Sequence, residues 1–206
     1  MRRSDLVDTP HGRALIVELD DEAGAEAALL GNEATIAAAL GPVRRREFIA
    51  GRAALRSLLG EPVPIVPDDR GAPILPAGWV GSISHKGERA AALLAPAGDG
   101  FVGLDIEVAA SPRQPIEKRI LTLREQQHVR DGRDVTRSFA IKEAIYKAID
   151  PMVRRYVGFT EVELDVATDG SCAVHILDAS RLPVVVEAWW QERDGLWLAT
   201  ARARPR

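Results

Sequence analysis

Two carboxylates lie close together on a short apolar segment, and their spacing suits the binding of a divalent metal ion. The segment 101–108 reads Phe-Val-Gly-Leu-Asp-Ile-Glu-Val, with the side-chain alternation of a β-strand. Asp105 and Glu107 then share one face with Gly103. Like charges this close repel each other unless a cation lies between them. Hard oxygen ligands of this kind favour Mg²⁺, and the competing interpretation is an exposed strand face with two solvated acids.

A third carboxylate follows on a predicted helix, four residues before a lysine. The segment 139–149 reads Phe-Ala-Ile-Lys-Glu-Ala-Ile-Tyr-Lys-Ala-Ile. Residues four apart on a helix are neighbours on one face, so Glu143 and Lys147 point the same way. One interpretation is a surface ion pair, which contributes little to stability. The functional interpretation assigns Glu143 to a metal ion and Lys147 to a phosphate group.

Residues suited to phosphate binding occur earlier in the chain. In the segment Gly-Ser-Ile-Ser-His-Lys-Gly, Ser84 and His85 stand where a predicted strand gives way to a turn, and both can donate to a phosphate oxygen. Arg44 and Arg52 are eight residues apart on a predicted helix, close to two turns, and guanidinium groups bind phosphate through paired donors. The alternative is a solvated basic face that pairs with the preceding acidic helix. Arg70, in an Asp-Asp-Arg-Gly turn, fits a ligand contact or a plain loop residue.

The elements that position these residues follow from hydrophobic periodicity and from turn residues. Helices are expected at about 20–40, at 42–60, where Pro42 opens the helix and Gly60 ends it, at 115–129 and at 137–149. Strands are expected at 13–19, 79–84, 89–94, 101–108, 159–166, 172–177, 184–192 and 196–202, with a hairpin turn at Asp194-Gly195. The proline-rich segment 61–78 is predicted to be an irregular loop.

Two of the predicted helices resemble each other in sequence. Segment 46–56 aligns with segment 137–147, so that Arg, Phe and Ala recur and Arg56 stands opposite Lys147. Such a match indicates duplicated lobes and puts Arg52 and Glu143 at equivalent positions. One lobe would then offer a cation and the other an anion to a shared cleft.

The composition excludes several classes of function. The 206 residues are 46% hydrophobic and 28% charged, which is ordinary for a folded domain, and the net charge of −3 argues against a general nucleic-acid binder. The single cysteine, Cys172, excludes an intramolecular disulfide and a cysteine-based zinc site, and it favours a reducing cytosol. No apolar run has the character of a signal peptide or a membrane span, so we expect a cytoplasmic protein.

The order and joint spacing of the motifs resemble those of one enzyme family. R-R-x-E-F-x-x-x-R, a D-x-x-G turn, G-S-I-S-H, G-L-D-I-E and F-x-x-K-E-A-x-x-K follow one another between about residues 44 and 149. Together they resemble the 4′-phosphopantetheinyl transferases of the Sfp and enterobactin-synthetase type. D-I-E with K-E-A-x-x-K is the most specific part of this resemblance.

The resemblance implies a reaction and a metal site. A serine hydroxyl of an apo carrier protein would attack the β-phosphate of coenzyme A, moving the phosphopantetheine arm to the serine and releasing adenosine 3′,5′-bisphosphate. Asp105, Glu107 and Glu143 are implied to hold Mg²⁺, or Mn²⁺ in its place. Glu143 is also the implied base for the serine proton, directly or through water, and Lys147, with Lys142 nearby, would neutralise the diphosphate.

The resemblance also implies contacts with the nucleotide and with the carrier. Arg44, Arg52 and His85 would grip the 3′-phosphate, Ser84 would touch a phosphate, and Arg70 would lie by the adenine. Carriers of this family are acidic, so a basic rim is expected to steer their approach, and its candidates are Arg113, Lys118, Arg119 and Arg124.

The implied fold is α+β, with two similar lobes related by a pseudo-twofold axis, residues 1–100 and 101–206. Antiparallel sheets would pack on helices, with the active site in the cleft between the lobes. The expected partners are coenzyme A and apo acyl or peptidyl carriers, with no nucleic acid or membrane, and the expected state is a monomer. Two alternatives stay open: another Mg²⁺-dependent phosphoryl or nucleotidyl transferase, and a non-catalytic coenzyme A-binding module.

Overall fold

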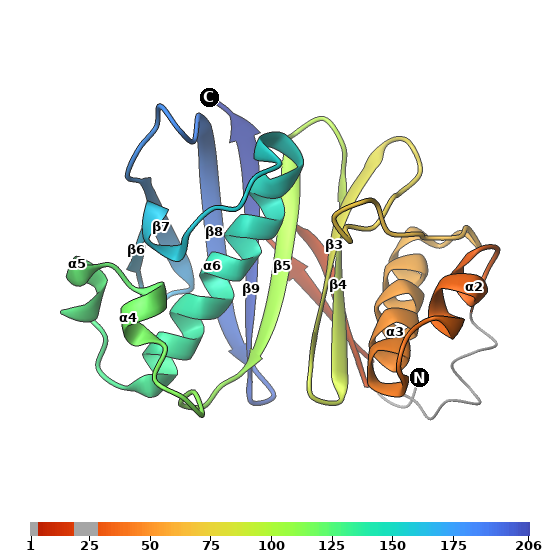
Figure 1. The fold of residues 1–206 in the computed structure, drawn as a ribbon, viewed down its shortest axis with the longest axis horizontal. Helices are drawn as coiled ribbons and strands as arrows, with labels where there is room; N and C mark the ends of the chain where they lie inside the picture. Colours follow the sequence, from red (N-terminus) through yellow and green to blue (C-terminus); the bar gives the residue numbers. More distant parts are fainter. Residues whose placement is uncertain (1–3, 19–28) are drawn as a thin grey trace. The chain divides into compact units, whose positions relative to one another are not determined.

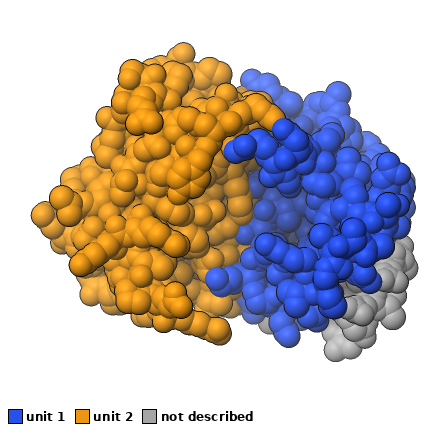
Figure 2. Space-filling model, in the orientation of Figure 1, with its two compact units in different colours: residues 1–98 blue, residues 99–206 orange. Residues whose placement is uncertain are grey.

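The chain forms two compact units, residues 1–98 and 99–206, and each contains one antiparallel sheet (Figure 1, Figure 2). The structure, a computed structural model, describes residues 4–18 and 29–206. Each unit buries its own set of apolar side chains, as an independent core requires. None of the helices in the described ranges is long and apolar enough to cross a membrane.

The first unit is a four-stranded sheet with one long helix packed on it. Its strands are hydrogen-bonded in the order β1-β2-β4-β3, all antiparallel, and are β1 (Ser4–Thr9), β2 (Gly12–Glu18), β3 (Trp79–Lys86) and β4 (Arg89–Pro96). The strands expected at 13–19, 79–84 and 89–94 correspond to β2, β3 and β4. The first strand was not expected, because its sequence Ser-Asp-Leu-Val-Asp-Thr is short and largely polar.

Helix α3 (Pro42–Leu59) begins and ends where the sequence predicts. Pro42 lies in the first turn, where a missing N–H removes no helical hydrogen bond, and Gly60 ends the helix with φ +73°. The helix packs closely on the sheet at Gly51, where an added Cβ would lie 2.4 Å from Ile83 Cγ2. This contact fixes α3 against β3, the strand that carries Ser84 and His85.

A buried glutamate fastens α2 (Glu33–Ala38) and the following loop to α3. Glu33 Oε1 accepts hydrogen bonds from Arg56 Nη1 at 2.9 Å and from the backbone N–H of Ile65 at 2.6 Å. Its Oε2 accepts from the backbone N–H of Leu30 at 2.8 Å. One carboxylate therefore satisfies donors from three segments, among them the irregular loop predicted at 61–78.

The second unit is a five-stranded antiparallel sheet covered on one face by a 22-residue helix (Figure 1). The strand order is β5-β9-β8-β7-β6, for β5 (Phe101–Val108), β6 (Val162–Val166), β7 (Ser171–Ile176), β8 (Val184–Arg193) and β9 (Leu196–Pro205). The predicted hairpin joins β8 to β9, and Asp194 and Gly195 both adopt positive φ, as its two-residue turn requires.

Helix α6 (Gly132–Val153) is longer than the predicted segment 137–149. Asp131 caps its N-terminus, since its side chain accepts from the backbone N–H groups of Arg133 and Asp134. The helix packs on β5 and β9. Its buried face carries mainly small and β-branched residues: Ala140, Ile141, Ala144, Ile145, Ala148 and Ile149.

Three expected elements differ from the structure. The helix expected at 115–129 is two short helices, α4 (Glu117–Ile120) and α5 (Leu123–Gln126), because a capping box of Thr122 and Glu125 starts a new helix. The strand expected at 159–166 begins with a 3₁₀ turn, η1 (Phe159–Glu161). Residues 20–28 of the helix expected at 20–40 lie outside the described residues, and the described part is helical only in α2.

The α+β fold class, with antiparallel sheets packed on helices, is confirmed. The relation of two similar lobes by a pseudo-twofold axis stays a prediction. The two segments aligned in sequence do fall on α3 and α6, the long helix of each unit.

Candidate functional site

Strand β5 presents the face with the two carboxylates to helix α6. An added Cβ on Gly103 would lie 1.9 Å from the carbonyl oxygen of Ala144 and 2.7 Å from the backbone nitrogen of Ala148, so the backbones of strand and helix nearly touch there. Side chains alternate along a strand, so Asp105 and Glu107 lie on this same face. The missing side chain at Gly103 therefore lets α6 approach the strand beside the carboxylates.

Asp105 is paired with a lysine from that helix. Lys147 Nζ donates to Asp105 Oδ1 at 2.7 Å and to the carbonyl oxygen of Leu104 at 2.9 Å. Asp105 is only 6% exposed, so its charge is largely removed from water and needs this compensation. Asp105 and Lys147 thus form a charged contact between β5 and α6.

Glu143 lies within electrostatic range of both strand carboxylates. Its pKa is raised, first because burial disfavours the charged form and then because Asp105 is negatively charged. Glu107 raises this pKa further, whereas the positive charges of Lys147 and Arg119 lower it. Three carboxylates and two cationic side chains of the second unit therefore lie within electrostatic range of one another. A divalent cation placed there would relieve the repulsion between the carboxylates.

The carboxylates suit Mg²⁺ by chemistry but do not form a preassembled metal centre. Within residues 4–18 and 29–206, no three carboxylate, imidazole or thiol side chains lie close enough together to hold a metal ion as they stand. Carboxylate oxygens are the ligands Mg²⁺ prefers, and it commonly takes few of them, with waters and substrate phosphates as the rest. The donor types at Asp105, Glu107 and Glu143 fit this pattern, and the metal role of the three residues stays a prediction.

Lys142 does not lie where a phosphate could reach it. Its side chain is fully buried, and its ammonium nitrogen lies 2.7–2.9 Å from four acceptor oxygens that share its three N–H donors, namely the carbonyls of Ile120, Phe159 and Val162 and Oε2 of Glu125. The prediction that Lys142 contacts the diphosphate is therefore wrong. Lys142 faces the interior because it lies three residues before Ile145 and seven before Ile149 on the buried face of α6.

In the first unit, the structure brings together Arg44 and His85. Arg44 Nη1 lies 3.0 Å from His85 Nε2, and Glu47 contacts both, through Oε2 to Arg44 and Oε1 to His85 Nδ1, each at 3.2 Å. A guanidinium is only a donor, so His85 accepts at Nε2 and carries its proton on Nδ1. Sequence reasoning missed Glu47 as the residue that orients this pair, although it is part of the R-R-x-E-F motif.

The other predicted phosphate contacts in this unit have different surroundings. Arg52 is 6% exposed, its guanidinium donates to the carbonyls of Ile65 and Phe48, and it stacks 3.5 Å from the centroid of the Phe48 ring. Burial lowers the pKa of Arg52 to about 10. Ser84 is buried, whereas Arg70 is exposed in a turn where its backbone N–H donates to Asp68.

A cavity of about 260 Å³ in the second unit contains none of the predicted site residues. It lies beside α5, α6 and β6, and it is lined by Glu125, His128, Val129, Arg137, Ser138, Leu164, Asp165, Val166 and Ala167. The cavity is therefore separate from the carboxylates on β5.

Comparison with known proteins covers both units. A sequence model of the 4′-phosphopantetheinyl transferase N-terminal domain matches residues 32–95, and one of the 4′-phosphopantetheinyl transferase superfamily matches residues 101–201. The 4′-phosphopantetheinyl transferase Svp of Streptomyces mobaraensis is 31% identical over an aligned length of 188 residues, and the alignment covers 83% of this chain and 74% of Svp. The 4′-phosphopantetheinyl transferase Npt of Nocardia iowensis is 35% identical over an aligned length of 130 residues, and the alignment covers 59% of each chain.

Among solved structures, the holo-[acyl-carrier-protein] synthase of Helicobacter pylori in complex with coenzyme A is similar, with a TM-score of 0.43 and 17% identity. The match covers 50% of this chain and all of that one.

Proposed function

The chain belongs to the 4′-phosphopantetheinyl transferases, and we propose that it transfers the 4′-phosphopantetheine arm of coenzyme A to a serine of an apo carrier protein. The serine oxygen forms a bond to the β-phosphorus of coenzyme A, and the bond from that phosphorus to the bridging oxygen breaks. Adenosine 3′,5′-bisphosphate leaves with the bridging oxygen, and the serine proton passes to a base. The observation that supports this reaction is the charged cluster of Asp105, Glu143 and Lys147 inside the region matched to the superfamily.

Asp105, Glu107 and Glu143 are the proposed ligands of Mg²⁺, with Mn²⁺ as a substitute. A bound Mg²⁺ would offset the negative charge of the diphosphate and of the carboxylates. The protein supports this role by holding Asp105 and Glu107 on one face of β5 and Glu143 on the adjoining helix. Phosphoryl transfer depends mainly on positioning and charge neutralisation, which such a rigid strand–helix contact provides.

Lys147 and Glu143 are the proposed catalytic residues on α6. Lys147 already holds a carboxylate at 2.7 Å and is 30% exposed, so its ammonium can also reach a phosphate oxygen. Glu143 is the proposed base that takes the serine proton, directly or through one water. Both residues are four apart on one helix face, so they meet the reacting groups from the same side.

Arg44 and His85 are the proposed contacts of the 3′-phosphate of coenzyme A. Arg44 is exposed, and its guanidinium and the His85 ring lie in contact, so both can turn to one anion. Arg52 is also proposed to contact the 3′-phosphate and Ser84 to contact a phosphate, since both belong to the same α3–β3 region. Arg70 is proposed to lie by the adenine.

The test is intact-mass analysis of apo carriers after incubation with coenzyme A and Mg²⁺. A gain of one phosphopantetheine on the carrier supports the proposal, whereas a gain of a phosphate or nucleotide from ATP in a parallel tube would show another transferase. Tight binding of coenzyme A without modification of any carrier in a panel of fatty-acid, polyketide and peptide carriers would show a binding module.

The variants Asp105→Asn and Glu143→Gln keep the shape of each side chain and remove its charge. We expect each to lower the rate of carrier modification by about 100-fold or more, because each removes a charge aimed at the reacting groups. The far-ultraviolet circular dichroism of both variants should match that of the parent chain. Normal rates in both variants would contradict the assignment of these residues.

The proposed partners are acidic apo carriers that meet a monomer in the cytoplasm. Arg113, Lys118 and Arg119 are exposed and can steer an acidic partner, whereas Arg124 is held by Glu163 at 2.9 Å and Asp165 at 2.6 Å. Steering by surface charge acts mainly on association rate, so salt should lower kcat/KM for the carrier far more than kcat. Light scattering of the purified chain tests the monomeric state.

A further inference from the structure

A buried lysine next to the candidate site has four acceptor oxygens around its ammonium, and the proposed reaction does not use it. Lys142 Nζ lies 2.7 Å from Glu125 Oε2, 2.8 Å from the carbonyl oxygens of Ile120 and Phe159, and 2.9 Å from that of Val162. The lysine side chain has no exposed surface. The ammonium is therefore committed to the interior of the second unit and cannot contact a substrate.

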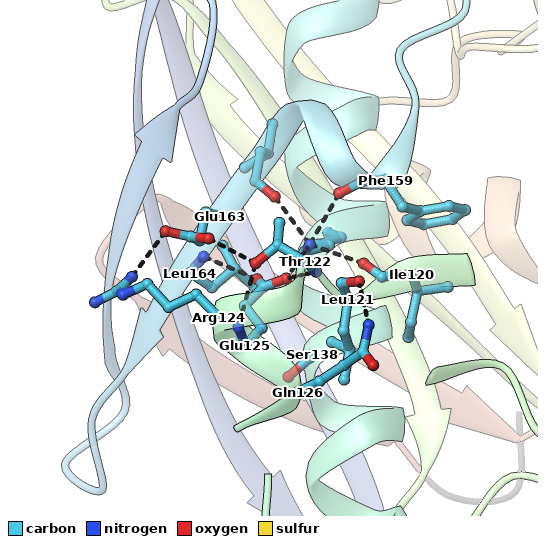
Figure 3. A network of polar contacts seen from close by, with 12 residues as sticks. Ile120, Leu121, Thr122, Arg124, Glu125, Gln126, Ser138, Phe159, Glu163 and Leu164 are labelled. Carbon is cyan, nitrogen blue, oxygen red and sulfur yellow. Dashed lines mark hydrogen bonds and ion pairs between the residues drawn. The ribbon is translucent and has the colours of Figure 1, made fainter. Parts of the chain in front are cut away.

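The partner carboxylate extends the network to two backbone donors. Glu125 Oε2 also accepts from the N–H of Thr122 at 2.7 Å, and Oε1 accepts from the N–H of Leu164 at 2.9 Å. Figure 3 shows these contacts converging from different segments around Glu125. A single ion pair thus fastens α4, α5, η1 and β6 to helix α6.

Two of the fastened segments, α4 and η1, contain residues next to groups that lie near Glu143. Glu143 directly follows Lys142 on α6, and Arg119, whose charge acts on Glu143, directly precedes Ile120. Phe159 packs its ring on Tyr146 at 5.1 Å between centroids and on Phe139 at 5.6 Å. The carbonyl oxygens of Ile120 and Phe159 both accept hydrogen bonds from Lys142. The ammonium therefore fixes the backbone next to Arg119 and the backbone that carries the Phe159 ring.

We propose that the buried Lys142–Glu125 pair is a positioning device for the carboxylate site, which fixes the turn of α6 that carries Glu143 against α4 and η1. This inference rests on the proposed function in assigning Glu143 to the metal and the reacting groups. Lys142 is thus a positioning residue that acts through its neighbours.

A charged pair suits this task better than apolar side chains would. Well-packed apolar residues often stabilise a core as much as a buried ion pair does, but hydrophobic contact has no direction. The three N–H donors of an ammonium are shared here by four oxygens, and a carboxylate accepts along fixed lone-pair directions, so the hydrogen bonds of the pair restrict how the four segments are arranged. A small displacement of a metal ligand or a base costs much of the rate, which makes such fixation useful here.

The experiment replaces the pair by neutral residues of similar size. The double variant Lys142→Met, Glu125→Gln removes both charges together, so no buried charge is left without a partner. The matched control is Arg56→Met, Glu33→Gln, which removes the corresponding buried pair of the first unit, where Arg56 also donates to Glu33 and to a loop carbonyl. Both variants lose a buried pair, and the first pair includes the residue that directly precedes Glu143 on α6.

Three quantities are measured well below the unfolding midpoint of each variant. They are the affinity for Mn²⁺, kcat, and KM for coenzyme A. Mn²⁺ binding is followed by electron paramagnetic resonance with and without coenzyme A, and a sample of coenzyme A without protein serves as the blank. For the Lys142 double variant we expect Mn²⁺ affinity and kcat to fall by about 10- to 100-fold, as when groups that orient metal ligands are removed. The KM for coenzyme A should stay unchanged, and the control variant should bind Mn²⁺ like the parent.

Two results would overturn the inference. Parent-like Mn²⁺ binding and kcat in the folded double variant would show that the pair serves stability alone. A raised KM for coenzyme A with unchanged kcat would show that Lys142 contacts the substrate.

The inference can still be tested if the double variant does not fold or if the parent chain modifies no carrier. If the double variant does not fold, Glu125→Gln alone is used, and parent-like Mn²⁺ binding in it contradicts the inference. If the parent modifies no carrier, the proposed function fails, whereas the comparison of Mn²⁺ affinities still tests the positioning role; a parent that binds no Mn²⁺ overturns both.

Discussion

Adjacent residues on α6 have opposite environments, and this contrast defines their tasks. Lys142 is fully buried among four oxygens, whereas Glu143 is partly exposed and faces the carboxylates of β5. Burial lowers the pKa of Lys142, and the carboxylate of Glu125 partly counteracts that effect. A charge in this position stabilises the fold only as long as its partner is present.

The single variant Lys142→Met should therefore be far less stable than the double variant. Removing the ammonium alone leaves the Glu125 carboxylate buried without a counter-charge, which costs about 3–5 kcal/mol. Adding Glu125→Gln should recover a large part of that loss. Urea unfolding followed by circular dichroism measures both, and equal stabilities of the single and double variants would contradict the prediction.

The corresponding pair in the first unit predicts a pH dependence. Burial alone would raise the pKa of Glu33, but hydrogen bonds from Arg56, Ile65 and Leu30 outweigh it, so the pKa lies below the ordinary 4.5. The carboxylate therefore contributes stability above the unfolded pKa, and this contribution is lost as the pH falls through the folded pKa. Glu33→Gln should be less stable than the parent at neutral pH, and the difference should shrink in acid. A difference that grows in acid would contradict this assignment.

At the scale of elements, the contact between β5 and α6 depends on one missing side chain. A Cβ on Gly103 would overlap the backbone of Ala144, which cannot move as a side chain could. Gly103→Ala should thus force strand and helix apart, at a cost of about 1–3 kcal/mol, and should shift Asp105 relative to Lys147. We expect lower thermal stability and a loss of kcat that exceeds any change in KM for coenzyme A.

Gly158→Ala is the matched control for that variant. Gly158 has an ordinary φ of −72°, and an added Cβ would approach only Glu161 Oε1, at 3.6 Å. This variant should keep the parent's melting temperature and rate. If Gly103→Ala behaves like the control, the close approach does not set the site.

Elements with strong local signals were predictable, and those set by tertiary contacts were not. Helix α3 begins at Pro42 and ends before Gly60, and the last hairpin turns at Asp194-Gly195. Each of these positions has a residue whose own backbone preference favours the start of a helix, its end or a tight turn. The break between α4 and α5 had a signal in Thr122-Leu-Arg-Glu125, a capping-box pattern, but the surrounding helical periodicity concealed it.

Among the site residues, the type and sequence position of the carboxylates were readable, whereas the role of Lys142 was not. Its place on the apolar stripe with Ile145 and Ile149 would have indicated burial. Its four acceptors come from segments 17 to 22 residues away, which no local pattern reveals.

At the scale of the whole molecule, the two units hold chemically different residues. The acids proposed for the metal and the two proposed catalytic residues all lie in the second unit, and the residues proposed for the 3′-phosphate all lie in the first. The two sequence models divide the chain in the same region, since one ends at residue 95 and the other begins at 101. Donor recognition and chemistry should therefore be separable by mutation.

Arg44→Ala tests that separation with two donors, coenzyme A and 3′-dephospho-coenzyme A. A charged hydrogen bond to the 3′-phosphate is worth about 1.5–3 kcal/mol, so the variant should lose roughly 10- to 100-fold in kcat/KM for coenzyme A. It should lose little with the dephosphorylated donor, which lacks the group that Arg44 is proposed to bind. Asp105→Asn should instead slow both donors by the same factor, because it alters the chemistry and not the recognition of the 3′-phosphate. If Arg44→Ala slows both donors equally, Arg44 acts on the fold or on the diphosphate, and the proposed division between the units is wrong.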